Sequence, residues 1–246
     1  MLFQGFITGV SFHQSQIDGA DNPLSGMCGR YSLLCIDDLG KRFRVTNPAL
    51  GFRSHFNIAP ASEQPVVLQE NGNTIVPMRW GLIPSWAKDS AIGHRLINAR
   101  AETLSERPAF RHLLKSHRCL VPASGFFEWK KVGNRKEPYY IRLRNAPLFA
   151  FAGLCDTWKS SDGSVILSYT IITTHPNELV AQVHDRMPAI LLPEYEGRWV
   201  AQAALSPDDV ARQLAPHPAG AMEMYRVSDR VNEPDNDTPG VIEPLG

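Results

Sequence analysis

The chain has 246 residues, of which 43% are hydrophobic and 20% charged, so it falls within the size range of one globular domain with a substantial core. Its 25 lysine and arginine residues balance 25 aspartate and glutamate residues, which argues against a protein that coats nucleic acid through a uniformly basic surface. No run of about eighteen apolar residues occurs, and the N-terminus lacks the pattern of a secretory signal. We therefore expect a cytoplasmic protein that does not enter a membrane.

The first 26 residues show no convincing periodicity and end in the turn-prone stretch 21–26, directly before Met27 and Cys28. We expect residues 1–26 to be an extension or a mis-assigned start that is absent from the active form. A start at Met27 with removal of the initiator is the favoured explanation, and a cleaved leader is the alternative. A catalytic domain is then expected over 27–235, followed by a tail over 236–246.

The elements expected after this point are short. In chain order we predict a helix over 36–45, a strand over 74–82, a helix over 104–115 with a break or start at Pro108, a hairpin of strands 139–143 and 148–154, a strand over 165–174, a helix over 177–183, a strand over 189–192 and a helix over 207–214. Short strands joined by turns, with helices placed irregularly among them, predict a single α+β domain with mainly antiparallel sheet.

The four cysteines are widely spaced, form no CxxC pair and have no histidines at zinc-finger spacing, so we expect reduced thiols, no structural metal and no cofactor. Charge is unevenly distributed along the chain. Between Lys88 and Arg144 thirteen basic residues stand against five acidic ones, whereas the segment 229–243 is acidic. This distribution favours a basic face, with chance clustering on a solvated surface as the alternative.

Four polar residues lie in unusual sequence contexts: Cys28, Asn98, Glu128 and His184. A lone cysteine is commonly a small buried hydrophobe, and a lone histidine commonly has a structural role. Glu128 is flanked by aromatic residues, so an inward side chain would be desolvated and its pKa raised. Strand alternation allows the opposite orientation, with Glu128 facing water.

Six motifs containing these residues occur in order, and together they resemble the SRAP family of SOS response-associated peptidases or abasic-site-processing proteins. They are Met27 to Tyr31, Phe56 to Pro60, Arg79 to Pro84, Asn98 to Glu102, Pro122 to Trp129, and His184 to Pro188. The resemblance covers about residues 28–233. It implies a protein of the DNA damage response whose N-terminal cysteine forms a thiazolidine with the ring-opened aldehyde of an abasic site in single-stranded DNA. It also implies that Asn98, Glu128 and His184 line the active site.

This chemistry accounts for the residue types. An α-amine has a reference pKa of about 7.7–8.0, so at neutral pH much more of it is free to attack an aldehyde than of a lysine amine. The thiol of the same residue can then close a five-membered ring on the imine, because tethered nucleophiles react at high effective molarity. We assign Glu128 to proton transfer during dehydration, His184 to proton handling at the sugar oxygen, and Asn98 to positioning. While residues precede Cys28, its nitrogen is a non-nucleophilic amide.

For binding DNA, the resemblance and the residue types suggest a set of eight positions. Arginine suits phosphate oxygens, tryptophan can stack on bases or pack in a core, and asparagine or threonine can add polar contacts. The candidates are Arg30, Asn57, Arg79, Trp80, Trp86, Arg100, Thr174 and Arg186. We expect a monomer, nucleoid-associated when bound to DNA, with the replication machinery as a candidate partner.

Two other classes of function remain open. One is a cysteine peptidase or amidohydrolase with Cys28 as nucleophile, His184 as base and Glu128 as orienting carboxylate. N-terminal-nucleophile amidotransferases can also begin with Met-Cys-Gly, but the later motifs of this sequence do not resemble theirs. Such a site could also remove the leader autoproteolytically. The other class is a non-covalent reader of single-stranded or modified DNA. Lyase activity by β-elimination could accompany capture.

Overall fold

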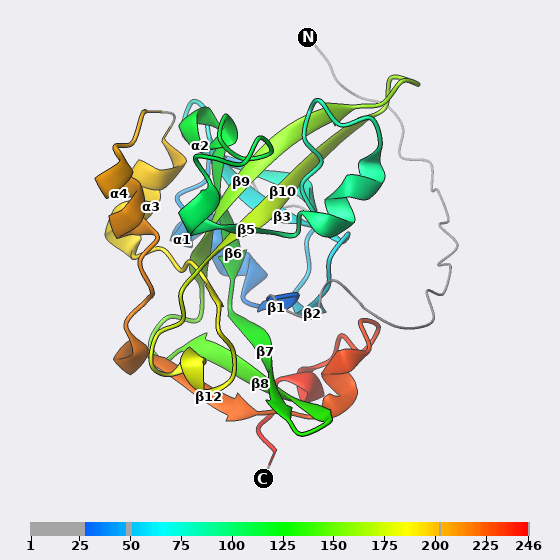
Figure 1. Ribbon diagram of the computed structural model, residues 1–246, viewed down its shortest axis with the longest axis vertical. Helices are drawn as coiled ribbons and strands as arrows, with labels where there is room; N and C mark the ends of the chain where they lie inside the picture. Colours follow the sequence, from blue (N-terminus) through cyan, green and yellow to red (C-terminus); the bar gives the residue numbers. More distant parts are fainter. Residues whose placement is uncertain (1–27, 48–50, 202, 246) are drawn as a thin grey trace.

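The computed structural model describes residues 28–47, 51–201 and 203–245, so the expected extension over 1–26 lies outside the described residues. Two β-sheets form the framework of the fold (Figure 1). The strands are β1 (Arg30–Leu33), β2 (His55–Ile58), β3 (Glu63–Gln69), β4 (Asn73–Trp80), β5 (Asn98–Arg100), β6 (Arg118–Ala123), β7 (Gly125–Val132), β8 (Arg135–Leu143), β9 (Phe149–Lys159), β10 (Val165–Thr174), β11 (Met187–Pro188) and β12 (Met222–Arg226). The α-helices are α1 (Leu39–Arg42), α2 (Leu113–Ser116), α3 (Pro193–Val200) and α4 (Pro207–Gln213). No helix within these residues has the length and apolar character needed to cross a membrane.

The first sheet has the order β12-β8-β7-β1-β2, and all of its pairings are antiparallel. In the second sheet, β10, β4, β3, β6 and β9 form a closed ring, because β9 pairs again with β10. Strands β5 and β11 attach to β10, and only β4 and β5 run parallel to it. Figure 1 shows β7, β8 and β12 in the lower part of the molecule, with β9 and β10 crossing its upper part. The predicted α+β class with mainly antiparallel sheet is confirmed.

Tyr31 on β1 joins the two sheets. Its ring is fully buried, with ring centroids 5.1 Å from Trp80 on β4 and 5.9 Å from Phe151 on β9. Its hydroxyl lies 2.7 Å from the hydroxyl of Tyr169 on β10. Burying a large side chain contributes about 1.5–3 kcal/mol. This packing therefore fixes β1, and with it the adjacent Cys28, against the second sheet.

Four predicted elements are confirmed. The strand expected over 74–82 is β4, and the strand over 165–174 is β10. The helix over 36–45 is a 3-10 turn followed by α1, and the helix over 207–214 is α4. A capping box formed by Ser206 and Asp209 begins α4, so local sequence signals specify it fully.

Other predicted elements are corrected by the structure. The segments 139–143 and 148–154 do lie in strands, β8 and β9, but these strands belong to different sheets and form no hairpin. Of the helix expected over 104–115, only α2 is α-helical, and turns occupy the stretch around Pro108. The helix over 177–183 is reduced to a 3-10 turn at Val180–Gln182. The strand expected over 189–192 lies earlier, as β11.

The segment expected to be a tail, 236–246, packs on the first sheet over its described part. One carboxylate oxygen of Asp237 accepts from the backbone N–H groups of Phe56 and Asn57 at 2.6 and 3.0 Å, and the other lies 2.6 Å from Nδ1 of His55. Val241 is fully buried in a small cluster with residues of β7 and β8. The end of the chain therefore stabilises the strand beside β1.

Candidate active site

Cys28 lies two positions before β1 and is fully buried. In the antiparallel pairing of β1 with β7, Arg30 stands opposite Phe127, so the chain ahead of Arg30 runs beside Glu128. The Cys28 thiol donates a long hydrogen bond of 3.8 Å to the carbonyl oxygen of Arg30. The fold thus places the amino end of this strand inside the protein, next to a carboxyl group.

Burial raises the pKa of the Cys28 thiol well above its ordinary value, and the charge of Glu128 acts in the same direction, while the hydrogen bond to the Arg30 carbonyl acts weakly against it. The thiol is therefore protonated at neutral pH. A thiolate nucleophile needs the opposite environment, electropositive and partly exposed. The site suits a neutral thiol that reacts after another group has bound the substrate.

Asn98 begins β5, where it pairs in parallel with Ile171 of β10 and is almost completely buried. Its side-chain Nδ2 donates a 2.8 Å hydrogen bond to the carbonyl oxygen of Cys28. Its Oδ1 has no hydrogen-bond partner among the described residues. Because an unmet buried acceptor costs free energy, this oxygen is suited to accept from a bound group.

Glu128 lies in the middle of β7 with only 1% of its surface exposed. Desolvation raises the pKa of its carboxyl well above the ordinary range, and the nearby charge of Asp185 raises it further. Its Oε1 has no hydrogen-bond partner among the described residues. The inward orientation is therefore the observed one, and burial favours the protonated carboxyl group, which can donate a proton.

His184 stands in the loop before β11, with its Nε2 3.9 Å from Oε2 of Glu128. Its Nδ1 accepts a 3.0 Å hydrogen bond from the backbone N–H of Arg186. The same Nδ1 lies 3.3 Å from the carbonyl oxygen of Arg186, so the backbone of that residue holds the ring with Nε2 turned toward Glu128. Asp185 is close to the same Nδ1, at 3.3 Å, with its carboxylate largely in solvent.

These four residues come from separate parts of the sequence and meet at one site. Asn98 binds the backbone of Cys28, Glu128 acts electrostatically on its thiol, and His184 faces Glu128. Within the described residues no hydrogen bond joins Cys28 to His184. The arrangement offers a protonated thiol, a carboxyl group whose protonated form is favoured by burial, an imidazole and an amide oxygen, a set suited to proton transfer around a nucleophilic addition.

Five of the eight candidate DNA-binding side chains are engaged inside the protein. Arg30 donates to Asn57 Oδ1 at 3.0 Å and to the Val231 carbonyl at 2.7 Å, and Asn57 donates to three carbonyls of the segment 231–236. Trp80 is 1% exposed and donates from Nε1 to the Ile97 carbonyl at 2.9 Å, so core packing is its observed role.

Arg186 and Thr174 complete this group of five. Arg186 is bidentate to Glu102 at 2.8 and 3.0 Å and donates to the Thr173 carbonyl at 2.7 Å. Thr174 is buried in β10, where it pairs with Met187 of β11. Four of these five side chains thus bind other groups of the protein and Thr174 is buried, and their contact with DNA stays a prediction.

The other three candidates are accessible. Trp86 is 60% exposed, on a loop that follows β4. Arg100 is exposed at the end of β5, two residues after Asn98, and Arg79 is half-buried on β4. Contact of these side chains with DNA stays a prediction, and their exposure allows it.

A profile of the family described as SOS response associated peptidase (SRAP) matches residues 27–234. The chain belongs to this family. It is 44% identical over 222 residues to the abasic site processing protein YoqW of Bacillus subtilis, covering 88% of this chain and 99% of that protein. It is 31% identical over 220 residues to the abasic site processing protein HMCES of Xenopus tropicalis, covering 76% of this chain and 65% of that protein. A crystal structure of a Bacteroides thetaiotaomicron protein matches with a TM-score of 0.81 and 27% identity, covering 89% of this chain and all of the other.

Two features of this SRAP site were not identified from the sequence. Glu102, at the end of the fourth motif, holds Arg186 next to His184, and its own pKa is lowered by this pairing against the opposing effect of burial. Tyr169 anchors Tyr31 from β10. The motif position of Glu102 was a usable signal, whereas a single tyrosine in an apolar strand gives none.

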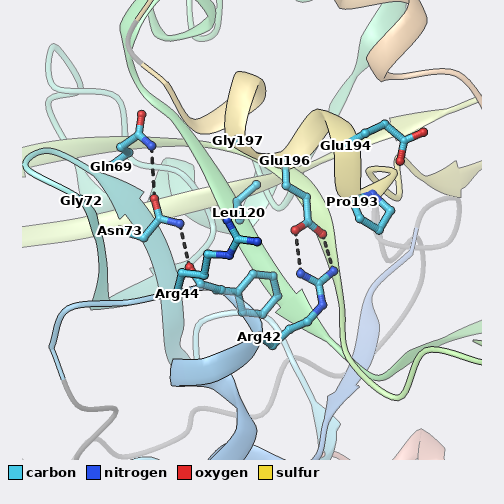
Figure 2. Close-up of a pocket in the computed structure, with 11 residues that line it drawn as sticks. Arg42, Arg44, Gln69, Gly72, Asn73, Leu120, Pro193, Glu194, Glu196 and Gly197 are labelled. Atoms are coloured by element: carbon cyan, nitrogen blue, oxygen red, sulfur yellow. Dashed lines mark hydrogen bonds and ion pairs between the residues drawn. The ribbon is translucent and has the colours of Figure 1, made fainter.

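The described residues contain no group of three or more histidine, cysteine, aspartate or glutamate side chains placed to hold a metal. A cavity of about 530 Å³ lies between α1, the β3–β4 turn and α3 (Figure 2). There Arg42 and Glu196 form a bidentate ion pair at 2.8 and 2.6 Å that ties α1 to α3. None of the residues that line this cavity is a candidate site residue, so we assign it no part in the chemistry.

Proposed function

We propose that this SRAP-family protein processes abasic sites in single-stranded DNA during the DNA damage response, and that it captures them covalently through the α-amine and thiol of Cys28. Its relatives in Bacillus and Xenopus are named abasic site processing proteins. The observation that carries the proposal is the burial of Cys28 beside Glu128, with its carbonyl held by Asn98.

The reaction balances without a cofactor. The Cys28 amine adds to the C1′ aldehyde of the opened sugar and gives a carbinolamine. Glu128 protonates the departing hydroxyl, so water leaves, and the resulting carboxylate takes the remaining proton from nitrogen, which gives the imine and restores the acid. The neutral thiol then adds to the imine carbon, its proton passes to nitrogen, and one water molecule has been released in total. His184 handles the proton at the sugar oxygen, and the free Oδ1 of Asn98 accepts from the amine or the sugar.

The protonation states favour this reaction over peptide hydrolysis. A cysteine peptidase needs Cys28 as a thiolate paired with a histidine. Here burial keeps the thiol neutral, and the short contacts of His184 are with Glu128, Asp185 and the backbone of Arg186. Peptidase action on other proteins is therefore the second candidate function. A more restricted version of it would be a single autoproteolytic cleavage that removes a leader.

The mechanism requires a free amine on Cys28. The family profile begins to match at residue 27, which supports a start at Met27 followed by removal of that methionine. Intact mass spectrometry of the protein from its natural host tests this step. An active form that retains Met1 would exclude thiazolidine formation.

Capture is tested by incubating the chain beginning at Met27 with single-stranded DNA containing one abasic site, then separating the products under denaturing conditions. We expect a DNA–protein adduct that disappears with Cys28→Ala and with DNA whose aldehyde has been reduced to an alcohol. Cys35→Ala is the matched control, because Cys35 is an exposed free cysteine, and it should leave the adduct unchanged. Absence of an adduct, with DNA affinity unaffected by Cys28→Ala, would instead indicate a non-covalent reader.

The same gel reports two further outcomes. Shortened DNA would reveal a β-elimination (lyase) step after imine formation. Turnover of a peptide substrate, lost in Cys28→Ala, would favour the peptidase. Association with the nucleoid and with the replication machinery follows from the proposed substrate and stays a prediction.

A further inference from the structure

The β7–β8 hairpin carries Glu128 near its base and a group of exposed cations at its end. We call these residues the hairpin cations: Lys130, Lys131, Arg135 and Lys136. Val132 pairs with Arg135 across a two-residue turn that begins at Gly133, whose φ of +60° suits glycine at this position. The ladder is regular from Phe126 to Val132, so the cations extend from the active-site strand itself.

The hairpin cations are not neutralised within the described protein, where none has a carboxylate within 4.0 Å. Glu137 stands opposite Lys130 in the ladder, yet its ion pair is with Arg226 of β12, at 3.2 Å. Lys131 stands directly opposite Lys136. Like charges directly opposite each other destabilise a hairpin, so these lysines do not stabilise the fold. Binding of an anionic partner would relieve the repulsion between them.

Strand alternation divides the cations between the two faces of the hairpin. Lys130 shares the face of Glu128, and Arg135 lies on the same face because it pairs with Val132. Lys131 and Lys136 lie on the opposite face, which nearer the base packs on the C-terminal cluster through Phe127. At about 3.3 Å per residue, Lys130 is about 7 Å and the level of Arg135 about 13 Å along the strand from Glu128.

We propose that Lys130 and Arg135 bind phosphates of the single-stranded DNA that flanks the abasic site. The proposal rests on the proposed function, because Glu128 marks where the abasic sugar lies. With phosphates about 3.4 Å apart along a stacked strand, these two cations reach phosphates roughly two to four positions from the sugar. The hairpin thus extends the binding site to one side, beyond the residues that surround Cys28.

Affinity is measured in a Cys28→Ala background, which cannot form the adduct, on single-stranded DNA bearing a tetrahydrofuran abasic analogue that has no aldehyde. We compare Lys130→Ala/Arg135→Ala with Lys131→Ala/Lys136→Ala, which removes the same charge from the other face. Each phosphate contact contributes about 0.7 to the slope of log K against log salt. Loss of two contacts should lower that slope by about 1.4 and weaken binding roughly 25-fold at 0.1 M salt.

We expect Lys130→Ala/Arg135→Ala to show the full loss of affinity and Lys131→Ala/Lys136→Ala to show less than half of that loss. The loss should also vanish on DNA shortened on the one side that reaches the hairpin. Equal effects of the two pairs, or no effect of either, would overturn the proposal; the latter would point to an acidic protein partner. The two proposals fail separately, because adduct formation by the protein with Cys28 intact tests capture, while affinity for the aldehyde-free analogue tests the hairpin.

Discussion

Replacing Arg186 by methionine tests whether this arginine acts inside the protein or on DNA. The substitution keeps most of the aliphatic stem and removes the guanidinium group. In the structure that group holds both carboxylate oxygens of Glu102 and the carbonyl of Thr173, with only 9% of the arginine side chain exposed. The same residue donates its backbone N–H to His184. Loss of the guanidinium should therefore weaken the support of the site.

The magnitude follows from the exposure of the partner. Breaking a buried ion pair typically costs about 3–5 kcal/mol because one charge is left buried and unpaired. The Glu102 side chain is 37% exposed and can be rehydrated, so we expect the smaller loss of about 2–3 kcal/mol in the free energy of unfolding. For a chain of this length that corresponds to a fall in Tm of about 4–12 °C. Adding Glu102→Gln should recover part of the loss, since it removes the unpaired carboxylate.

The assay combines thermal or denaturant unfolding with DNA affinity at several salt concentrations. On the structural interpretation, Arg186→Met lowers stability and the rate of adduct formation, while the slope of log affinity against log salt stays the same. A slope reduced by about 0.7, with stability unchanged, would show that Arg186 contacts a phosphate and would refute a purely structural role for it.

Three further predictions concern other parts of the site. Adduct formation should slow as pH rises through the raised pKa of Glu128, and Glu128→Gln should abolish this dependence of the rate on pH. The variant should also gain stability relative to the native protein as pH rises above about 4.5, because the fold opposes ionisation of the native carboxyl while the unfolded chain ionises freely. Unfolding measurements over a pH series that show no such divergence would exclude a buried acid. Tyr31→Phe alone should cost about 1–3 kcal/mol by leaving the Tyr169 hydroxyl without its partner, and the double change to phenylalanine should cost less than the two single changes added together, as a double-mutant cycle in denaturant would measure. Trp86→Ala should weaken binding to single-stranded DNA by about 1–3 kcal/mol with Tm nearly unchanged, since its side chain lies mostly in solvent; equal binding would remove it from the interface.

The sequence predicted the elements whose signals are local. A continuous β-branched and apolar run specifies β10, and a capping box with a following proline specifies the start of α4. The pairing of β8 and β9 was wrong because alternation shows that a segment is a strand but not which strand it pairs with. Here the turn between them carries the chain from one sheet to the other.

The candidate site shows the same division. Motif order indicated Cys28, Asn98, Glu128 and His184, and the fold brings them together. Sequence could not decide the environment of Trp80, because a large aromatic serves a core as well as an interface.

The internal engagement of Arg30 and Arg186 was equally out of reach. The partners of Arg30 include carbonyls about 200 residues away along the chain, and the carboxylate that holds Arg186 lies 84 residues before it. Such pairs become visible only when the tertiary structure is known.

Strand β1, which begins two residues after Cys28, is synthesised early, but some of its hydrogen-bonding partners are synthesised late. Its neighbour β7 ends at Val132, and the carbonyls that hold Arg30 belong to Val231 and Asn232. During synthesis β1 therefore gains its partners in steps, first β2, then β7, and last these two carbonyls. The last hydrogen bonds of Arg30, two residues after the reactive cysteine, can therefore form only after the segment around Val231 has been synthesised.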